Sequence, residues 1–171
     1  MSKAFTKDES DPQVADVITP RAPLPSGTPN YVTPRGLALL RSELAQLEAE
    51  RGALSAEDDL GRRATARLAT RIAELEGRIA SAVPVDSATH ARDGVRFGAT
   101  VAVRAVDGTL RRFQIVGVDE ADPQHGRIAF VAPLARALLG RSVGSEVTFQ
   151  SPRGVEELEV VEICYEDSTP G

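Results

Sequence analysis

The chain of 171 residues is 42% hydrophobic and 26% charged, and its formal net charge is −5. These fractions are ordinary for a globular protein, so they argue against wholesale disorder and against a membrane protein. The single cysteine excludes an internal disulfide framework and a cysteine-based zinc site. His90 and His125 lie in predicted loops without a partner at metal-ligand spacing, so we expect no metal and no cofactor. The acidic net charge favours protein partners over nucleic acid as the ligand of the whole chain.

Residues 1–30 are rich in proline and poor in large apolar side chains. Such a stretch cannot bury enough surface to offset the entropy lost on ordering, so it is predicted to be a disordered arm. Residues 1–10 carry charges of both signs and no apolar core, unlike a secretory signal. We therefore expect a cytoplasmic protein that has no membrane association.

The spacing of apolar residues predicts two helices, each with one narrow seam. The first helix is expected to begin after Thr33, because a threonine hydroxyl can cap the helix and Pro34 is favoured in its first turn. Its seam residues are Leu37, Leu40, Leu44, Leu47 and Leu54. The seam residues of the second helix are Leu68, Ile72, Leu75, Ile79 and Ala82.

Residues 55–61 separate the two seams and predict a tight reversal of the chain. Ser55 is the expected N-cap of the second helix. Glu57, Asp58 and Asp59 fall in the first turn of that helix, where the helix dipole favours negative charge.

Two helices of similar length that are joined by a short turn pack antiparallel. Residues 31–83 are therefore predicted to form an antiparallel coiled-coil hairpin with about 20 residues per arm, roughly 30 Å long. Leu44 and Ile72 are expected to face each other across the seam. Because the seam is occupied within one chain, we expect a monomer and not a module that dimerises through its helices.

A different pattern follows the predicted linker at residues 84–92 and extends over residues 93–166, before a short tail at 167–171. The predicted strands are 100–104, 111–118, 126–131, 146–150 and 157–163, with hairpin turns at 107–108 and 152–154. One helix from Pro133 to about Leu139 interrupts them and is closed by Gly140 in a left-handed conformation. The fold class is therefore α+β, with an N-terminal helical hairpin and a small C-terminal β-sheet domain that contains one short helix.

Three segments of the C-terminal domain resemble the GreA and GreB transcription elongation factors, whose C-terminal domain has an FKBP-like fold: residues 95–101, 113–123 and 133–140. Residues 1–6 and 31–36 resemble the start of GreB and its entry to the hairpin, and residues 71–76 are similar to the return helix of GreA. The resemblance covers nearly the whole chain.

This resemblance implies that the globular domain binds bacterial RNA polymerase at the rim of its secondary channel and that the hairpin enters the channel. Acidic residues at the tip then help to hold a catalytic magnesium ion, so that the polymerase cleaves the transcript of a backtracked complex. The resemblance also implies that the factor itself is not an enzyme. Val131, Ala132 and Pro133 stand where GreB has Asp-Ser-Pro in its docking loop, and Arg136 is the best exposed contact candidate.

The sequence departs from the cleavage factors at the hairpin. Each arm is about two turns shorter, which shortens the reach of the tip by roughly 11 Å. The family's acidic tip has the pattern Gly-Asp-x-Ser-Glu-Asn, whereas residues 52–57 carry alanine at both acidic positions. Glu57, Asp58 and Asp59 are the candidates to replace those acids, and the alternative is that they only cap the helix.

Arg62, Arg63, Arg67 and Arg71 form a predicted basic stripe near the tip. The resemblance implies contact with the RNA 3′ end or with DNA in the elongation complex, and the alternative is a solvated flank of the coiled coil. We therefore expect a factor that modulates elongation with transcript cleavage weakened or lost. Two alternatives are an active cleavage factor that uses the tip carboxylates and an FKBP-like prolyl isomerase, which would require an aromatic-lined pocket.

Overall fold

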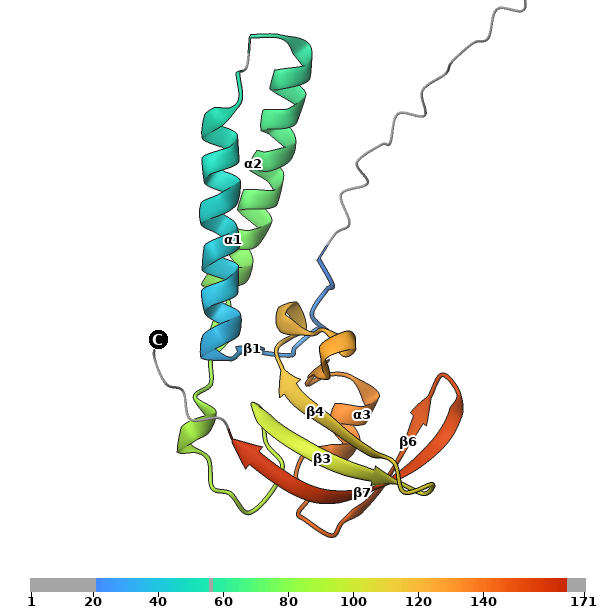
Figure 1. The fold of residues 1–171 in the computed structure, drawn as a ribbon. Coiled ribbons are helices and arrows are strands. Elements are labelled where there is room, and N and C mark those ends of the chain that lie inside the picture. The colour runs from blue at the N-terminus through green and yellow to red at the C-terminus, as the bar shows by residue number, and fades with distance from the viewer. Residues whose placement is uncertain (1–20, 56, 166–171) are drawn as a thin grey trace, which may run out of the picture.

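The computed structural model describes residues 21–55 and 57–165. A helical hairpin projects from a globular domain that is built around a curved β-sheet (Figure 1). This is the α+β architecture expected from the sequence.

The hairpin begins where the sequence predicts. Strand β1 (Asn30–Val32) leads into helix α1 (Pro34–Ala53). Thr33 has an extended backbone, and its hydroxyl accepts a 2.9 Å hydrogen bond from the Gly36 amide. This bond satisfies one of the amides that have no partner inside the helix. Pro34 occupies the first turn, where its missing N–H costs nothing.

The turn between the helices differs from the prediction, because Glu57 and Asp58 precede the second helix and only Asp59 lies in its first turn. Helix α2 spans Asp59–Ala80, so its N-cap is Asp58 and the prediction of Ser55 was wrong. Asp58 Oδ1 accepts a 2.7 Å hydrogen bond from the amide three residues further along the chain. Ser55 lies too far before the helix for this role, and its hydroxyl instead accepts a hydrogen bond from the Glu57 amide within the turn.

The two helices pack along the predicted seam. Leu40, Leu47, Ile72 and Leu75 are buried, and Leu37, Leu44, Leu68 and Ile79 are partly buried against them. Leu54 was wrongly placed in the seam, because α1 ends before it and leaves it 39% exposed as the C-cap. The outer faces of both arms are mainly polar, although Leu39 and Leu60 are exposed there. No helix among the described residues is long and apolar enough to cross a membrane.

Gly77 lies on the exposed side of α2, where an added Cβ would meet no atom within 4 Å. A glycine inside a helix costs about 0.5–1 kcal/mol relative to alanine, because its backbone loses more entropy on folding. We therefore expect Gly77→Ala to stabilise the hairpin by about that amount, measured as slower hydrogen exchange of the α2 amides. Faster exchange in α2 would contradict this expectation.

The globular domain contains a sheet of strand order β5-β4-β3-β7-β6, in which β4 and β5 are parallel and the other neighbours are antiparallel. Its strands are β3 (Ala99–Ala105), β4 (Leu110–Val116), β5 (Arg127–Ala129), β6 (Glu146–Ser151) and β7 (Gly154–Tyr165). All five predicted strands are present. The second and third are shorter than predicted, because β4 is followed by the short 3-10 helix η2 (Val118–Glu120) and β5 by the turn into helix α3.

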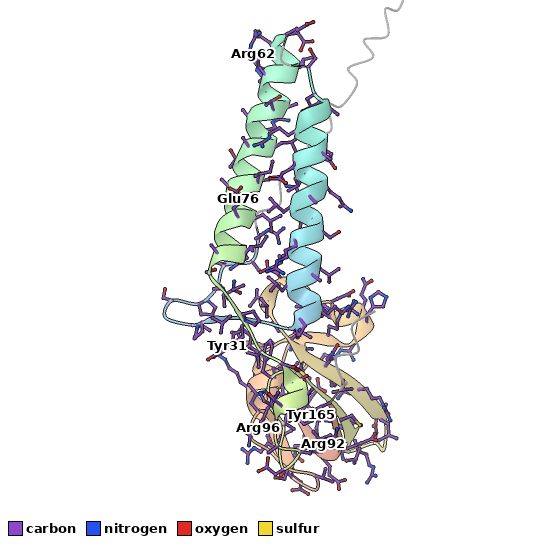
Figure 2. All side chains as sticks on the ribbon, turned by 90° about the vertical axis from the view of Figure 1, so that its left-hand side faces the viewer. Tyr31, Arg62, Glu76, Arg92, Arg96 and Tyr165 are labelled. Carbon is purple, nitrogen blue, oxygen red and sulfur yellow. The ribbon has the colours of Figure 1, made fainter. Side chains whose placement is uncertain are left out.

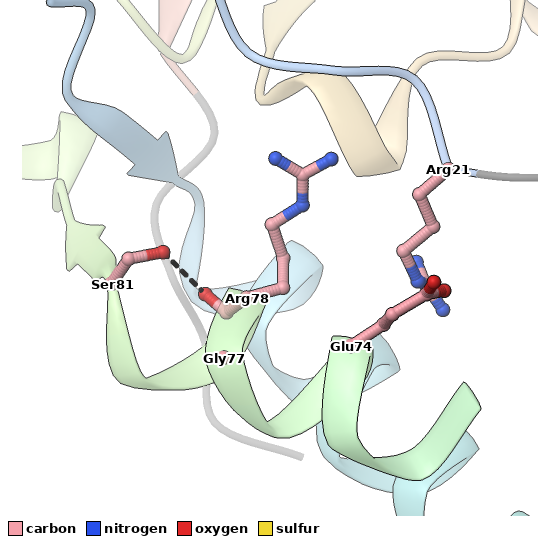
Figure 3. Close-up of a pocket in the computed structure, with 5 residues that line it drawn as sticks. All are labelled: Arg21, Glu74, Gly77, Arg78 and Ser81. Atoms are coloured by element: carbon pink, nitrogen blue, oxygen red, sulfur yellow. Dashed lines mark hydrogen bonds between the residues drawn. The ribbon is translucent and has the colours of Figure 1, made fainter. Parts of the chain in front are cut away.

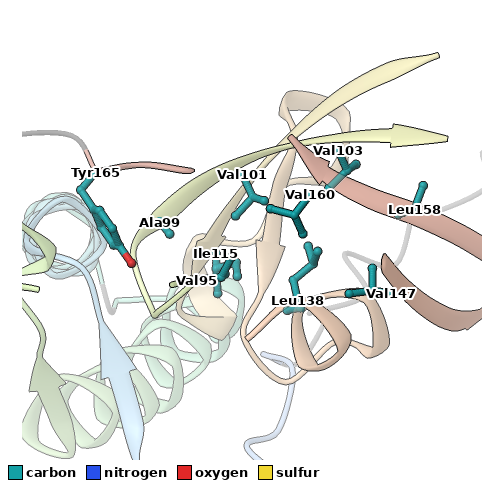
Figure 4. Packing of buried hydrophobic residues seen from close by; sticks show 11 residues of the cluster. Val95, Ala99, Val101, Val103, Ile115, Leu138, Val147, Leu158, Val160 and Tyr165 are labelled. Carbon is teal, nitrogen blue, oxygen red and sulfur yellow. The ribbon is translucent and has the colours of Figure 1, made fainter. Parts of the chain in front are cut away.

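The core lies between the sheet and helix α3 (Pro133–Leu138), as Figure 4 shows. Its fully buried side chains include Val101, Val103, Ile115, Leu138 and Val160. Gly140 follows α3 with a φ of 80°, the left-handed conformation that the sequence predicts. At one end of the core, the Tyr165 hydroxyl donates a 2.5 Å hydrogen bond to the Gly94 carbonyl oxygen.

The segments on either side of the hairpin make more contacts than an arm and a linker would. β1 pairs in parallel with β2 (Ala82–Pro84), and Ser87 in the short 3-10 helix η1 (Ser87–Thr89) is buried. Residues 21–30, which were expected to belong to the disordered arm, contact both the hairpin and the globular domain. They do so through ion pairs and strand pairing, which the low apolar content did not reveal. Residues 1–20 and the predicted tail lie outside the described residues.

Candidate functional site

The acidic residues at the hairpin tip take part in local structure. Asp58 caps α2, and Asp59 forms an ion pair with Arg62. Figure 2 shows Arg62 at the far end of the hairpin. Arg62 also donates a 3.1 Å hydrogen bond to the Glu57 carbonyl oxygen. All of these residues are exposed, and the carboxylates lie where the helix dipole favours negative charge. In the part of the chain that is described, no cluster of three His, Cys, Asp or Glu side chains could hold a metal ion.

The four arginines of the predicted basic stripe have different surroundings. Arg62 contacts the acidic tip, and the Arg71 guanidinium lies 3.8 Å from the Glu43 carboxylate of α1. Arg63 and Arg67 are exposed one turn apart, and neither has an ion pair with another described residue. Within this stripe, the positive charge that is open to a partner is therefore concentrated at Arg63 and Arg67.

The predicted docking segment lies at the start of α3. Ala132 is the N-cap of this helix without a side-chain hydrogen bond, and it packs partly buried against the core. Val131 is also half-buried, whereas Pro133 and Arg136 are exposed on the same helix. Pro133 and Arg136 are therefore the residues of this segment that are best placed to contact a partner.

Glu120 joins the globular domain to the start of the hairpin. Its side chain is 3% exposed, and its carboxylate accepts a hydrogen bond from the Thr33 hydroxyl. A Cβ at Gly36 would lie 2.7 Å from Glu120 Oε2, so the glycine allows the carboxylate to approach the positive end of α1. Gly117 approaches the hairpin in the same way, because a Cβ there would lie 2.6 Å from the Tyr31 carbonyl oxygen.

Three aromatic rings fill the joint between the hairpin and the globular domain. The Tyr31 ring centroid lies 5.9 Å from that of Phe97 and 5.6 Å from that of Phe130, and the two phenylalanine rings are 5.7 Å apart. Figure 2 places Tyr31 at the base of the hairpin. A prolyl isomerase would need such rings to line an open pocket for the proline. Here the rings are packed against one another, which disfavours that alternative.

Residues 89–165, which include the whole five-stranded sheet and α3, match the family model described as transcription elongation factor, GreA/GreB, C-term. Transcription elongation factor GreA of Psychrobacter sp. (strain PRwf-1) is 35% identical over 153 residues, which cover 79% of this chain and 97% of the relative. The chain belongs to the GreA/GreB family of transcription elongation factors. GreB of Neisseria meningitidis serogroup A is similarly related, with 36% identity over 155 residues that cover 81% of this chain and 95% of the relative.

Two solved structures resemble this GreA/GreB-family chain more loosely. The transcription elongation factor GreA/GreB from Nitrosomonas europaea has a TM-score of 0.41 and 23% identity, over 79% of this chain and 98% of that one. GreA factor homolog 1 (Gfh1) of Thermus thermophilus has a TM-score of 0.38 and 24% identity, over 80% of this chain and 99% of that one. Similarity at this level adds nothing to the functional argument.

Sequence reasoning placed the arginines of this GreA/GreB-family chain on the second helix and Pro133 and Arg136 on α3, as the structure has them. It wrongly put Glu57 and Asp58 in the first turn of the second helix, and it missed the residues that join the two domains. Glu120 and Gly117 lie inside residues 113–123, a segment that carries the family resemblance, yet no local pattern assigned them a role. Arg21 was missed because it belongs to the proline-rich stretch. The available signal was the position of Arg21, a charged residue within this stretch and shortly before the hairpin, which could have indicated an ion pair.

Proposed function

We propose that this Gre-family protein binds RNA polymerase through its globular domain, occupies the secondary channel with its hairpin and modulates elongation with little or no stimulation of transcript cleavage. In this proposal the protein is not itself an enzyme, because the chemistry of transcript cleavage belongs to the polymerase. The observation that carries the proposal is the short hairpin with a tip at which two of the three candidate carboxylates, those of Asp58 and Asp59, take part in local structure.

The length of the hairpin supports the loss of cleavage. α1 has 20 residues and α2 has 22, so each arm is about 30 Å long. The match to the Psychrobacter GreA runs over 153 residues but includes only 79% of the 171 residues here, which is about 135, so about 18 positions of the relative have no counterpart. Two missing turns on each of two arms amount to about 14 residues. A shortfall of roughly 11 Å would prevent metal coordination, which tolerates only tenths of an ångström.

The chemistry of the tip points the same way. Asp58 is the cap of α2 and Asp59 is paired with Arg62, so two of the three candidate acids already have local partners. Ala53 and Ala56 stand where the family pattern has its acids. The proposed docking surface lies in the part of the chain that matches the family model, which includes α3 with the exposed Pro133 and Arg136.

The test is a transcript-cleavage assay on backtracked polymerase complexes with the purified protein alone and in competition with a GreA that has a longer hairpin. We expect cleavage close to the rate of polymerase alone, and inhibition of the GreA-stimulated reaction. Arg136→Glu, at the exposed docking position, should abolish that inhibition. Its matched control is Arg153→Glu, in the β6–β7 turn, which should still inhibit.

A variant with an uncharged tip distinguishes the proposed function from the alternative that the protein is an active cleavage factor. Glu57→Gln, Asp58→Asn and Asp59→Asn together remove the negative charge, while asparagine remains a good N-cap. The triple variant should inhibit GreA as the parent does. The proposal would be wrong if the parent cleaved transcripts as fast as GreA and the triple variant did not, since the carboxylates would then reach the catalytic metal.

A further inference from the structure

A chain of alternating charges runs from the middle of the hairpin to its base. Arg71 of α2 lies 3.8 Å from Glu43 of α1, and the same carboxylate is 2.5 Å from the Arg21 guanidinium. The other side of Arg21 lies 3.1 Å from Asp119 of η2, and Asp119 in turn is 3.0 Å from Arg78 near the end of α2. The chain of charges thus connects the segment before the hairpin, both arms and the globular domain.

Arg21 is the link on which this chain depends, because it is the only member that contacts both carboxylates. Its side chain is 25% exposed, and that of Asp119 is 7% exposed, so water screens this part of the network less than it screens a surface ion pair. Burial works against the charged form of Arg21, but hydrogen bonds to Glu43 and Asp119 outweigh it and raise the pKa of the guanidinium.

The backbone of the same segment is tied to the hairpin. Arg78 donates a hydrogen bond to the Ala22 carbonyl oxygen. At the other end of the segment, Asn30 Nδ2 donates hydrogen bonds to the Arg78 carbonyl oxygen at 2.9 Å and to Ser81 Oγ at 3.1 Å. Between these ends stand Pro23, Pro25 and Pro29, whose restricted backbone lowers the entropy lost when the segment is ordered.

Figure 3 shows Arg21 reaching from this segment toward Glu74 on α2, with Arg78 beside it. The two arginines and Glu74 line one cavity of about 330 Å³ together with Gly77 and Ser81. Four of these five lining residues have charged or polar side chains.

We propose that residues 21–30 act as a brace and that Arg21 is a positioning residue, which fixes the direction in which the hairpin leaves the globular domain. The brace is attached to α1 at Glu43, well away from the base of the hairpin. Glu43 is nine residues beyond Pro34, about 14 Å along α1, whereas the Thr33–Glu120 contact and the aromatic cluster lie at the base. A restraint so far from the pivot limits the swing of the tip better than contacts at the pivot do. The value of this brace to polymerase binding rests on the proposed function.

The only cysteine in the chain makes the test direct. Cys164 is exposed on β7 of the globular domain, and an added Cβ at Gly52 near the end of α1 meets no atom within 4 Å. Gly52→Cys therefore provides a second spin-label site at the far end of the hairpin. The distance distribution between the two labels reports the direction of the hairpin in the full chain, without polymerase.

Arg21→Ala in this background should broaden the label-to-label distribution, while the unfolding midpoint of the chain stays nearly unchanged. Arg21→Lys should restore the distribution only in part, because an ammonium cannot bridge two carboxylates as a guanidinium does. The matched control is Arg41→Ala, which removes an exposed arginine of α1 and should leave the distribution unchanged. We also expect Arg21→Ala to weaken competition with GreA for polymerase about fivefold, near the upper limit for such ion pairs.

The brace is disproved if Arg21→Ala and Arg41→Ala give the same distribution as the parent. If the distribution broadens but competition is unaffected, the brace exists and its value to polymerase binding is disproved. Failure of the proposed function looks different, because in that case even the parent does not compete with GreA. The spin-label distances would still decide whether the brace exists.

Discussion

Leu75→Ala is expected to open the hairpin while the globular domain stays folded. Leu75 is 0% exposed in the seam, where it packs in one cluster with Leu40, Leu47 and Ile72. Removal of a fully buried leucine costs about 3 kcal/mol, because transfer free energy is lost and a cavity is left. The arms of the hairpin share no core residue with the sheet, so the loss should stay local.

Hydrogen exchange measures this separation directly, since it reports local opening amide by amide. The α1 and α2 amides should exchange faster in Leu75→Ala, whereas those of β3 and β7 should keep their protection. Leu60→Ala is the matched control, because Leu60 is on the same helix but 75% exposed and should change stability by less than about 0.5 kcal/mol. Equal loss of protection in both domains would show that they unfold as one unit.

Gly117→Ala is expected to loosen the joint between the domains by about 2 kcal/mol. The new methyl group would lie 2.6 Å from the Tyr31 carbonyl oxygen, which is part of a backbone that cannot move aside cheaply. Overpacking of this kind typically costs about 1–3 kcal/mol. The backbone of Gly117 has a φ of −65°, which alanine adopts readily, so the effect is purely steric.

Two amides distinguish a loosened joint from a damaged domain. The Val85 amide donates to the Val32 carbonyl oxygen at the base of the hairpin, and the Gly98 amide donates to the Ile115 carbonyl oxygen inside the domain. In Gly117→Ala only the Val85 amide should exchange faster. Gly77→Ala adds the same methyl group in open space and should stabilise the hairpin, so the two substitutions should have opposite signs. Stabilisation by Gly117→Ala would mean that the joint is not tightly packed.

The elements of this fold were predictable because their signals are local. The helices were recognised from the spacing of apolar residues and from the Thr-Pro pair at the start of the first one. The strands were recognised from alternating apolar residues and from glycine in the turns. Each of these signals can be read within a short stretch of sequence. The N-cap of α2 was missed although its neighbourhood was correct. Ser55, Asp58 and Asp59 can all cap a helix, and the choice depends on the residue at which the helix begins, which sequence predicts least well.

The contacts between the hairpin and the globular domain could not be predicted from short stretches of sequence. Arg21 and Asp119 are 98 positions apart, and Thr33 and Glu120 are 87 apart. Their contacts exist only after the hairpin has folded back and brought β2 beside β1. The candidate docking site was likewise only partly predictable from the sequence. Sequence placed Pro133 and Arg136 on a helix, but only the structure separates them from Val131 and Ala132, which are partly covered.

The parallel pairing of β1 with β2 brings together the two ends of the hairpin, and we call this pair of strands the neck. Asn30 pairs with Ala82 and Val32 with Pro84, so the chain enters and leaves the helices at the same place. The length of the arms can therefore change without a change in how the hairpin is attached to the globular domain. A heptad added to each arm would extend the tip by about 10 Å and keep the seam in register, without any change at the neck. Variation in reach among such factors thus requires no redesign of the domain that carries them.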